Sequence, residues 1–307
     1  MPTIREALLA RLDSIAQLPT MPQVLLSLEQ ALQDPNSAAM HIATIVREDP
    51  SLTASVLRVA NSVIYRGRFA SNTASVRQAV SRLGFREISR ICTSVVLIRT
   101  FSDFGRGIDH GEFWMHSLSV ATAVRVFGEY TSWPQLLPSS WEEDAFVAGL
   151  LHDVGMLVMD QYFPEQFNLI RERAEEKGIP LAKAEERVLG IHHGEIGGIL
   201  LENWSLPRRV TEAVRWHHDP DLASEANRTI AQMVHLADFV CVNQSIGSTL
   251  EGLYDGFSEG AWHDLGLSID QVPRILEDVK EEAEKSEIMR GSLVSEGRPK
   301  RDGHRHR

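Results

Sequence analysis

The stretch that decides the fold class is DPSLTASVLRVANSVIY, residues 49–65. Its apolar residues recur at intervals of three and four, which places them on one face of a helix. They are Leu52, Val56, Val59, Ala60, Val63 and Ile64. Asp49 is a favoured residue type just before a helix, and Pro50 suits the first helical position. The stretch therefore predicts an amphipathic helix that begins at Pro50.

The segments that follow repeat the same helical periodicity. Residues 76–83 carry a short apolar stripe that stops at Gly84, and residues 88–95 continue it on a new helix. No convincing alternating strand pattern is found, so we expect an all-α fold. The two short helices around Gly84 also fit a helix–turn–helix DNA reader, but their repeated apolar positions favour ordinary bundle packing.

Loops divide the chain into two helical parts. FSDFGRGIDH, residues 101–110, contains two glycines and predicts the boundary between them. We expect an N-terminal helical subdomain over 1–108, a second helical subdomain over 109–286, and a disordered charged tail over 287–307. Within the second part, 131–144 reads as a loop and SIDQVPRILEDVKEEAEK as the last amphipathic helix.

Length and composition are those of an ordinary globular protein. The chain has 307 residues, of which 43% are hydrophobic and 24% charged. Cys92 and Cys241 cannot form a disulfide framework, and they read as core thiols in a reducing cytosol. The first residues lack the apolar core of a signal peptide, and the longest apolar runs are too short to span a membrane. These features predict a soluble, cytoplasmic protein with no membrane partner.

Charge is distributed unevenly along the chain. The net charge is −11, yet residues 45–110 contain ten arginines and five acidic residues, which leaves that segment at +5. A solvated helical surface is the simplest explanation. A docking face for an acidic partner or for nucleic acid is the alternative. Because the excess is modest and no aromatic residues are interleaved with the arginines, we consider nucleic acid unlikely.

An adjacent His-Asp pair stands out in LLHDVGM, residues 150–156, where apolar residues flank it on what reads as a helix. His116, His217 and Asp238 also fall on the apolar faces of expected helices. A lone inward histidine is usually a satisfied core residue, but several inward polar groups would each need a buried partner. One shared cation would satisfy them together. Gly149 and Gly155 flank the pair and would allow close backbone approach.

The remaining histidines and acids carry weaker signals. We expect His235 to pack, although it lies close enough to Asp238 to orient it. His192 is expected to face solvent, and Glu186, seven residues before His193, to be a surface residue rather than an extra ligand. His41 and His110 belong to no cluster.

In their order along the chain, His116, His152-Asp153 and Asp238 resemble the metal-binding quartet of the HD superfamily of phosphohydrolases. In two-metal relatives, further histidines complete a second site. The positions that match them here are His193, His217 and His218. The resemblance implies one or two divalent ions, for which Fe, Mn or Zn suit His and carboxylate ligands.

The chain as a whole resembles the HD-related output domain (HDOD) family from about Leu18 to Val242. The first half carries LPTMPQV, IVREDPSLTASVLRVANSVIY and SVRQAVSRLGFREISRI, and the later half FWMHSL, AGLLHDVGM, ENWSLPRRVTEAVRWHHDP and MVHLADFV. This is a bacterial signalling module without an established general activity. The resemblance implies an N-terminal helical bundle packed on an HD-like bundle, and a regulatory output function exerted through a signalling protein partner.

The sequence departs from catalytic relatives at two places. Active cyclic-dinucleotide phosphodiesterases of the HD-GYP family carry a Lys soon after the His-Asp pair, where this chain has Met156. The Gly-Tyr-Pro motif expected after the later His pair is also missing. We therefore expect a structural or sensory metal site and name no catalytic residue. The alternative is a metal-dependent phosphohydrolase acting on nucleotides or cyclic dinucleotides.

Overall fold

The computed structural model describes residues 4–14, 18–32, 38–62, 65, 72–105, 107–132, 140–246, 253–254 and 256–294. Throughout these residues the regular elements are helices, which confirms the all-α fold class. A single continuous apolar core runs through both halves of the chain.

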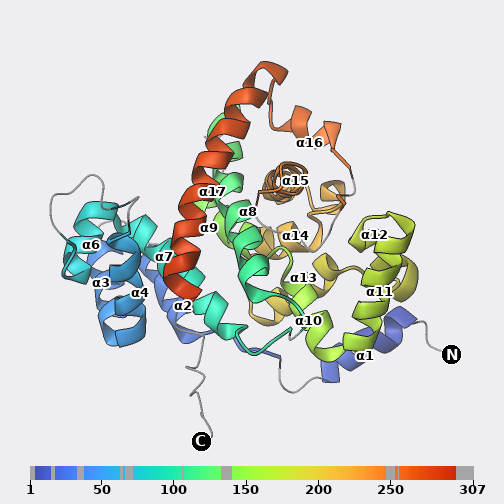
Figure 1. Cartoon of the computed structure of the whole chain (residues 1–307), viewed down its shortest axis with the longest axis horizontal. Coiled ribbons are helices and arrows are strands. Elements are labelled where there is room, and N and C mark those ends of the chain that lie inside the picture. Colours follow the sequence, from blue (N-terminus) through green and yellow to red (C-terminus); the bar gives the residue numbers. More distant parts are fainter. Residues whose placement is uncertain are drawn as a thin grey trace, which may run out of the picture.

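Five helices pack together in the first half (Figure 1). They are α2 (Gln23–Leu32), α3 (Ala38–Glu48), α4 (Pro50–Ala60), α6 (Val76–Leu83) and α7 (Phe85–Thr100). Helix α4 begins as predicted, because a carboxylate oxygen of Asp49 accepts the backbone N–H groups of Ser51 and Leu52. The stripe on α4 is buried in the core, whereas Val63 and Ile64 lie outside the described residues.

The second half is built around the long helix α8, which packs against α9, α15 and α17. Its helices are α8 (His110–Tyr130), α9 (Trp141–Leu151), α10 (Val154–Tyr162), α11 (Pro164–Lys177), α12 (Leu181–Leu189), α13 (His193–Asn203), α14 (Arg208–Arg215), α15 (Arg228–Asn243), α16 (Glu259–Asp264) and α17 (Val272–Val294). The 3₁₀ turns η2 (Pro220–Leu222) and η3 (Ile269–Gln271) precede α15 and α17. Helix α9 begins at Trp141, so the expected loop over 131–144 ends earlier than predicted.

Two terminal helices depart from the predicted subdomain boundaries. Helix α1 (Ile4–Ser14) contacts α12, and Figure 1 shows it among the helices of the second half. Arg5 fastens it there by donating to the Gly190 carbonyl at 2.6 Å and to both carboxylate oxygens of Glu195. Helix α17 continues to Val294 and so includes the first eight residues of the expected tail, and residues 295–307 lie outside the described part.

Arginines of the first half form part of the contact between the halves. Arg90 on α7 is 7% exposed and donates to Glu142 on α9 at 3.0 Å, and Arg86 reaches the same carboxylate at 3.2 Å. Some of the basic excess over 45–110 is therefore matched within the molecule. Helix α17 makes a second connection, because it packs on both α8 and α4. Within the described residues, no helix combines the length and apolarity needed to cross a membrane.

Candidate metal centre

The His-Asp pair lies in a turn, so the prediction of an uninterrupted helix there is wrong. Helix α9 ends at Leu151 and α10 begins at Val154. The Nδ1–H of His152 donates to the Gly149 carbonyl at 2.8 Å. That carbonyl is the acceptor that the Asp153 N–H would use in a continuing helix, so the side chain competes with the helix. In the turn both side chains point to one centre, whereas neighbours on a helix diverge by about 100°.

The later histidine pair also lies beyond a helix end, although the sequence placed His217 on a helical face. Helix α14 ends at Arg215, and His217 and His218 occupy the turn that follows. The Nδ1–H of His217 donates to the Val214 carbonyl at 2.7 Å. A histidine side chain again takes a carbonyl near the helix end, and the helix stops there.

All the predicted ligands converge around Asp153. They come from α8 (His116), the α9–α10 turn (His152 and Asp153), the start of α13 (His193), the turn after α14 (His217 and His218) and α15 (Asp238). The Nε2 atoms of His152 and His193 lie 3.2 and 3.1 Å from the two Asp153 oxygens. The Nε2 of His116 lies 3.0 Å from Asp238 and 3.7 Å from Asp153.

Hydrogen bonds at Nδ1 fix the ring orientation of three histidines. His152 and His217 donate Nδ1–H to backbone carbonyls, and the Nδ1 of His193 lies 2.8 Å from Oε2 of Glu185. Because a neutral imidazole that gives its Nδ1–H to an acceptor keeps a lone pair on Nε2, each ring presents that lone pair to the centre. This is the usual second-sphere arrangement of histidine ligands in metal sites.

Seven buried side-chain atoms at this centre lack a hydrogen bond. They are Nδ1 and Nε2 of His116, Nε2 of His152, Oδ1 of Asp153, Nε2 of His217, and both carboxylate oxygens of Asp238. Several of these atoms lie 3.0–3.8 Å apart without hydrogen-bond geometry. An unsatisfied buried polar group costs about 1–3 kcal/mol, so these atoms together destabilise the native state unless another group satisfies them. The residues therefore fit a bound cation.

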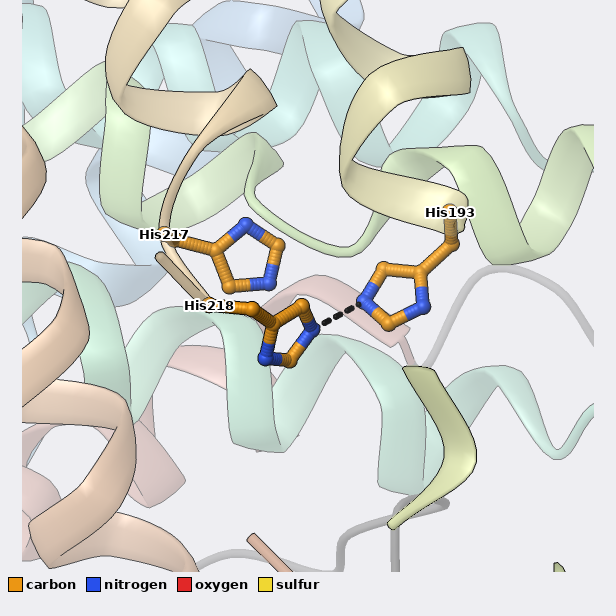
Figure 2. Close-up of side chains that lie close together, drawn as sticks. All are labelled: His193, His217 and His218. Atoms are coloured by element: carbon orange, nitrogen blue, oxygen red, sulfur yellow. Dashed lines mark hydrogen bonds between the residues drawn. The ribbon is translucent and has the colours of Figure 1, made fainter. Parts of the chain in front are cut away.

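The ligand atoms form two groups. In one, atoms of His116, His152 and Asp153 lie within 4.8 Å of one another, and in the other those of His193, His217 and His218 do. Figure 2 shows the second group, in which the Nε2 atoms of His218 and His193 are 2.9 Å apart. Asp153 connects the groups, because its two oxygens face His152 and His193 respectively.

The pKa values of the ligand side chains are shifted in different directions by burial and by neighbouring charges. Burial disfavours the charged form of His152, but Asp153 and Asp238 outweigh it and raise the pKa of His152 to about 9. Burial also opposes ionisation of Asp153, yet His152 and His193 hold the pKa of that carboxyl well below its usual range. Burial and neighbouring histidines lower the pKa values of His217 and His218 far below normal. Glu185 and Asp153 likewise raise the pKa of His193 against the effect of burial. Because an ionised carboxylate and neutral imidazoles are the metal-binding forms, His152 and His193 would each release a proton on binding an ion.

Two glycines bring the helices close enough for this convergence, as predicted. A Cβ on Gly149 would lie 2.7 Å from the Cα of Ala121 on α8, the helix that carries His116. A Cβ on Gly155 would lie 2.0 Å from the carbonyl oxygen of His193. The backbone on both sides of the His-Asp pair therefore touches the helices that supply its neighbours.

Glu185 is the residue that the sequence reasoning missed. It is fully buried in α12 and accepts the backbone N–H of His193 as well as lying against its ring. Its signal was available, because Glu185 occupies the i+4 position of an apolar stripe made by Leu181, Ala184, Val188 and Leu189. Glu186 next to it is exposed, as expected.

The prediction that His192 faces solvent is wrong. Its side chain is 4% exposed, caps α13 and accepts the backbone N–H of Gly194. Burial, followed by the charge of His193, lowers the pKa of His192 to about 3, so the ring is neutral. His235 packs in the core, as expected. His41 is exposed, and His110 contacts the Phe104 carbonyl away from the centre.

A polar cavity of about 550 Å³ borders the second ligand group. His218, His192 and His235 form its inner wall, and Arg5 and Lys183 also line it. The first group has no such opening, since His116, His152, Asp153 and Asp238 are at most 3% exposed. Met156, where the resemblance to HD-GYP phosphodiesterases would imply Lys, is fully buried.

Comparisons with known proteins agree with this architecture. An HDOD domain protein of unknown function from Geobacter sulfurreducens superposes with a TM-score of 0.74 at 27% identity, over 95% of this chain and 96% of that one. A Marinobacter aquaeolei protein named for signal transduction gives a TM-score of 0.77 at 24% identity, over 95% of this chain and 66% of that one, and shows the same fold.

Among curated sequences, an uncharacterized protein of Treponema pallidum (strain Nichols) is 25% identical over 228 residues. The match covers 74% of this chain but only 42% of that relative's length. The HDOD domain family matches residues 18–220, which span the first half of the chain and all the ligand positions except Asp238. This chain therefore belongs to the HDOD family.

Proposed function

We propose that the protein is a cytoplasmic signal-transduction regulator that acts through a protein partner, and that its second half is held by one or two divalent transition ions. The observation that carries the metal centre is the set of seven buried polar atoms around Asp153 that have no hydrogen bond. Cys92 and Cys241, which are buried and unpaired with each other, are consistent with a reducing compartment.

The first ion position would be formed by His116, His152, Asp153 and Asp238, and the second by His193, His217 and His218. Asp153 has one oxygen toward each position. A bound Fe, Mn or Zn ion supplies positive charge and Lewis acidity there. The chain's own contribution is to orient the imidazoles of His152, His193 and His217 through their Nδ1 atoms. Burial of the first position excludes bulk water from it.

The first half supplies the candidate docking surface. It leaves Arg47 on α3 and Arg77 on α6 exposed, whereas Arg86 and Arg90 are used at the contact with α9. An acidic protein surface is the partner chemistry that these exposed arginines favour. Capture with wild-type protein and with an Arg47→Glu/Arg77→Glu variant tests this, because a partner retained equally by both does not bind here.

Elemental analysis after anaerobic purification tests the metal centre. We expect about one or two equivalents of Fe, Mn or Zn per chain, and a lower melting temperature after chelation. Protein that contains no transition metal, and whose stability is unchanged by chelator, would instead have a hydrogen-bonded polar core.

A metal-dependent phosphohydrolase is the second candidate, and the cavity beside His218 is the observation that favours it. Against it stand Met156 in place of a phosphate-binding lysine and the missing Gly-Tyr-Pro motif. We expect metal-loaded protein to hydrolyse cyclic dinucleotides very slowly or not at all. Product formation that an Asp153→Asn substitution abolishes would replace the regulatory proposal with the enzymatic one.

A further inference from the structure

The turn that carries His217 and His218 is fastened by two side chains from elsewhere in the chain. His217 and His218 lie outside any helix, so the backbone hydrogen bonds of α14 do not hold them. The Nδ1–H of His235 on α15 donates to the His217 carbonyl at 2.7 Å. The hydroxyl of Tyr254 donates to the same carbonyl at 3.3 Å.

Tyr254 also packs directly on the imidazoles. Its ring centroid lies 5.6 Å from that of His218 and 5.4 Å from that of His235. Its hydroxyl oxygen is 3.3 Å from the His235 Nδ1, so the phenol and the imidazole approach one carbonyl side by side. The peptide that joins the two ligands is thus held at its carbonyl, and the ring of the second ligand lies in tilted contact with Tyr254.

We propose that His235 and Tyr254 are positioning residues for the second ion. They set the geometry of the His217–His218 turn and therefore the affinity and exchange rate of the second ion, while the first ion is independent of them. This inference rests on the proposed metal centre. In this proposal His235 does more than pack in the core, because it holds the His217 carbonyl in place. Tyr254, which lies between α15 and α16, does the same.

The different surroundings of the two positions make them separable by experiment. His218 lies on the wall of the 550 Å³ cavity, whereas the ligands of the first position are enclosed. A chelator should therefore remove the second ion quickly and the first slowly. Loss of an outer hydrogen bond to a metal ligand typically lowers metal affinity by about 10–100-fold.

The experiment uses the full chain, stripped and reloaded with Zn²⁺, and measures stoichiometry, the two dissociation constants and release to a chelator. For Tyr254→Phe, which keeps the ring, and for His235→Leu, we expect the weaker site to lose at least about tenfold in affinity. The fast release phase should accelerate, and the tight site should stay within about twofold. His235→Asn should recover much of the loss, because its amide places an N–H near the position of Nδ1.

Tyr130→Phe is the matched control, since it removes a hydroxyl that donates to Asp278 at 2.6 Å outside the centre. It should change neither site. Two Zn²⁺ sites that respond equally to Tyr254→Phe, or that ignore it, would overturn the positioning role while leaving the metal centre intact. A single Zn²⁺ site in the wild type would overturn the second position itself. Wild-type protein that binds no Zn²⁺ would overturn the proposed metal centre as well.

Discussion

The two halves of the molecule bury different kinds of side chain. In the first half the described core is apolar apart from hydroxyl groups and Arg90, and Arg90 reaches Glu142 across the contact between the halves. The second half buries six histidines and several carboxylates in the same kind of helical framework. Hydrophobic burial alone can hold the first half together, whereas in the second half the proposed ion would compensate buried polar and charged groups. The predictions below test this contrast through the coupling of each substitution to metal.

The largest coupling is expected at Asp153. If metal holds three helices together through this residue, binding to the native state stabilises it by about 4 kcal/mol when free metal is ~1,000-fold above Kd. In metal-replete buffer, Asp153→Ala should lose most of this contribution to the free energy of unfolding. In stripped protein the change should cost less, because it removes a buried carboxylate that lacks its ion and loses only its contacts with His152 and His193. Chemical denaturation of both proteins in both buffers gives the coupling.

Asp160 supplies the control for this cycle. It is 6% exposed on α10 and accepts the backbone N–H of Gly107 at 2.7 Å, away from the ligand groups. Asp160→Ala should destabilise by the same amount with and without metal. Equal losses for Asp153→Ala in the two buffers would mean that its carboxylate acts like that of Asp160, as a hydrogen-bonded core group.

The next effect is expected at Gly155, where the helices carrying the ligands touch. An alanine Cβ would clash with the backbone of His193 and Gly197, neither of which can rotate away. Overpacking of this kind costs about 1–3 kcal/mol, and separating α10 from α13 should also weaken metal binding. Thermal melts with and without metal measure both. Gly291→Ala in α17, where a Cβ meets nothing within 4 Å, should be neutral or slightly stabilising.

A smaller, purely electronic effect is expected at Glu185. Glu185→Gln keeps the shape of the side chain, and its amide oxygen can still accept both N–H groups of His193, but the substitution removes the negative charge that makes the Nε2 of His193 a stronger metal ligand. Metal affinity should fall by about 10–100-fold, or about 1.4–2.7 kcal/mol. Calorimetric titration is the measurement. Glu186→Gln, one residue along and exposed, should leave the affinity unchanged.

The contrast between the halves also explains what the sequence could predict. The helix over 50–60 follows from a strong apolar stripe, an Asp cap and an N1 proline, all of which are local signals. The ligand set was predicted in part from residue types on apolar helix faces and in part from the resemblance to the HD superfamily. The turns that hold His152 and His217 were missed, because each depends on a side chain taking a backbone carbonyl from its own helix.

Long-range packing accounts for the remaining differences. The burial of His192 and the placement of α1 on α12 depend on residues far apart in the chain, such as Arg5 and Glu195, which periodicity within one segment does not connect. Glu185 is the intermediate case. Its position on an apolar stripe was visible, but its partner, the ring of His193, could be known only from the fold.

The smallest coupling is expected in the first half, at Leu52. This residue is fully buried on α4, so Leu52→Ala should cost about 2–5 kcal/mol through lost burial and a residual cavity. Its coupling to metal should be near zero, because the first half contains no ligand. Yet α4 packs on α17, and α17 packs on the helix that carries His116, so a physical connection exists. Chemical denaturation with and without metal tests whether this path couples metal binding to the stability of the first half. Equal losses make the metal centre a local structural clamp, whereas a difference above about 0.5 kcal/mol, the usual limit of additivity, would show that α17 transmits metal occupancy to the first half.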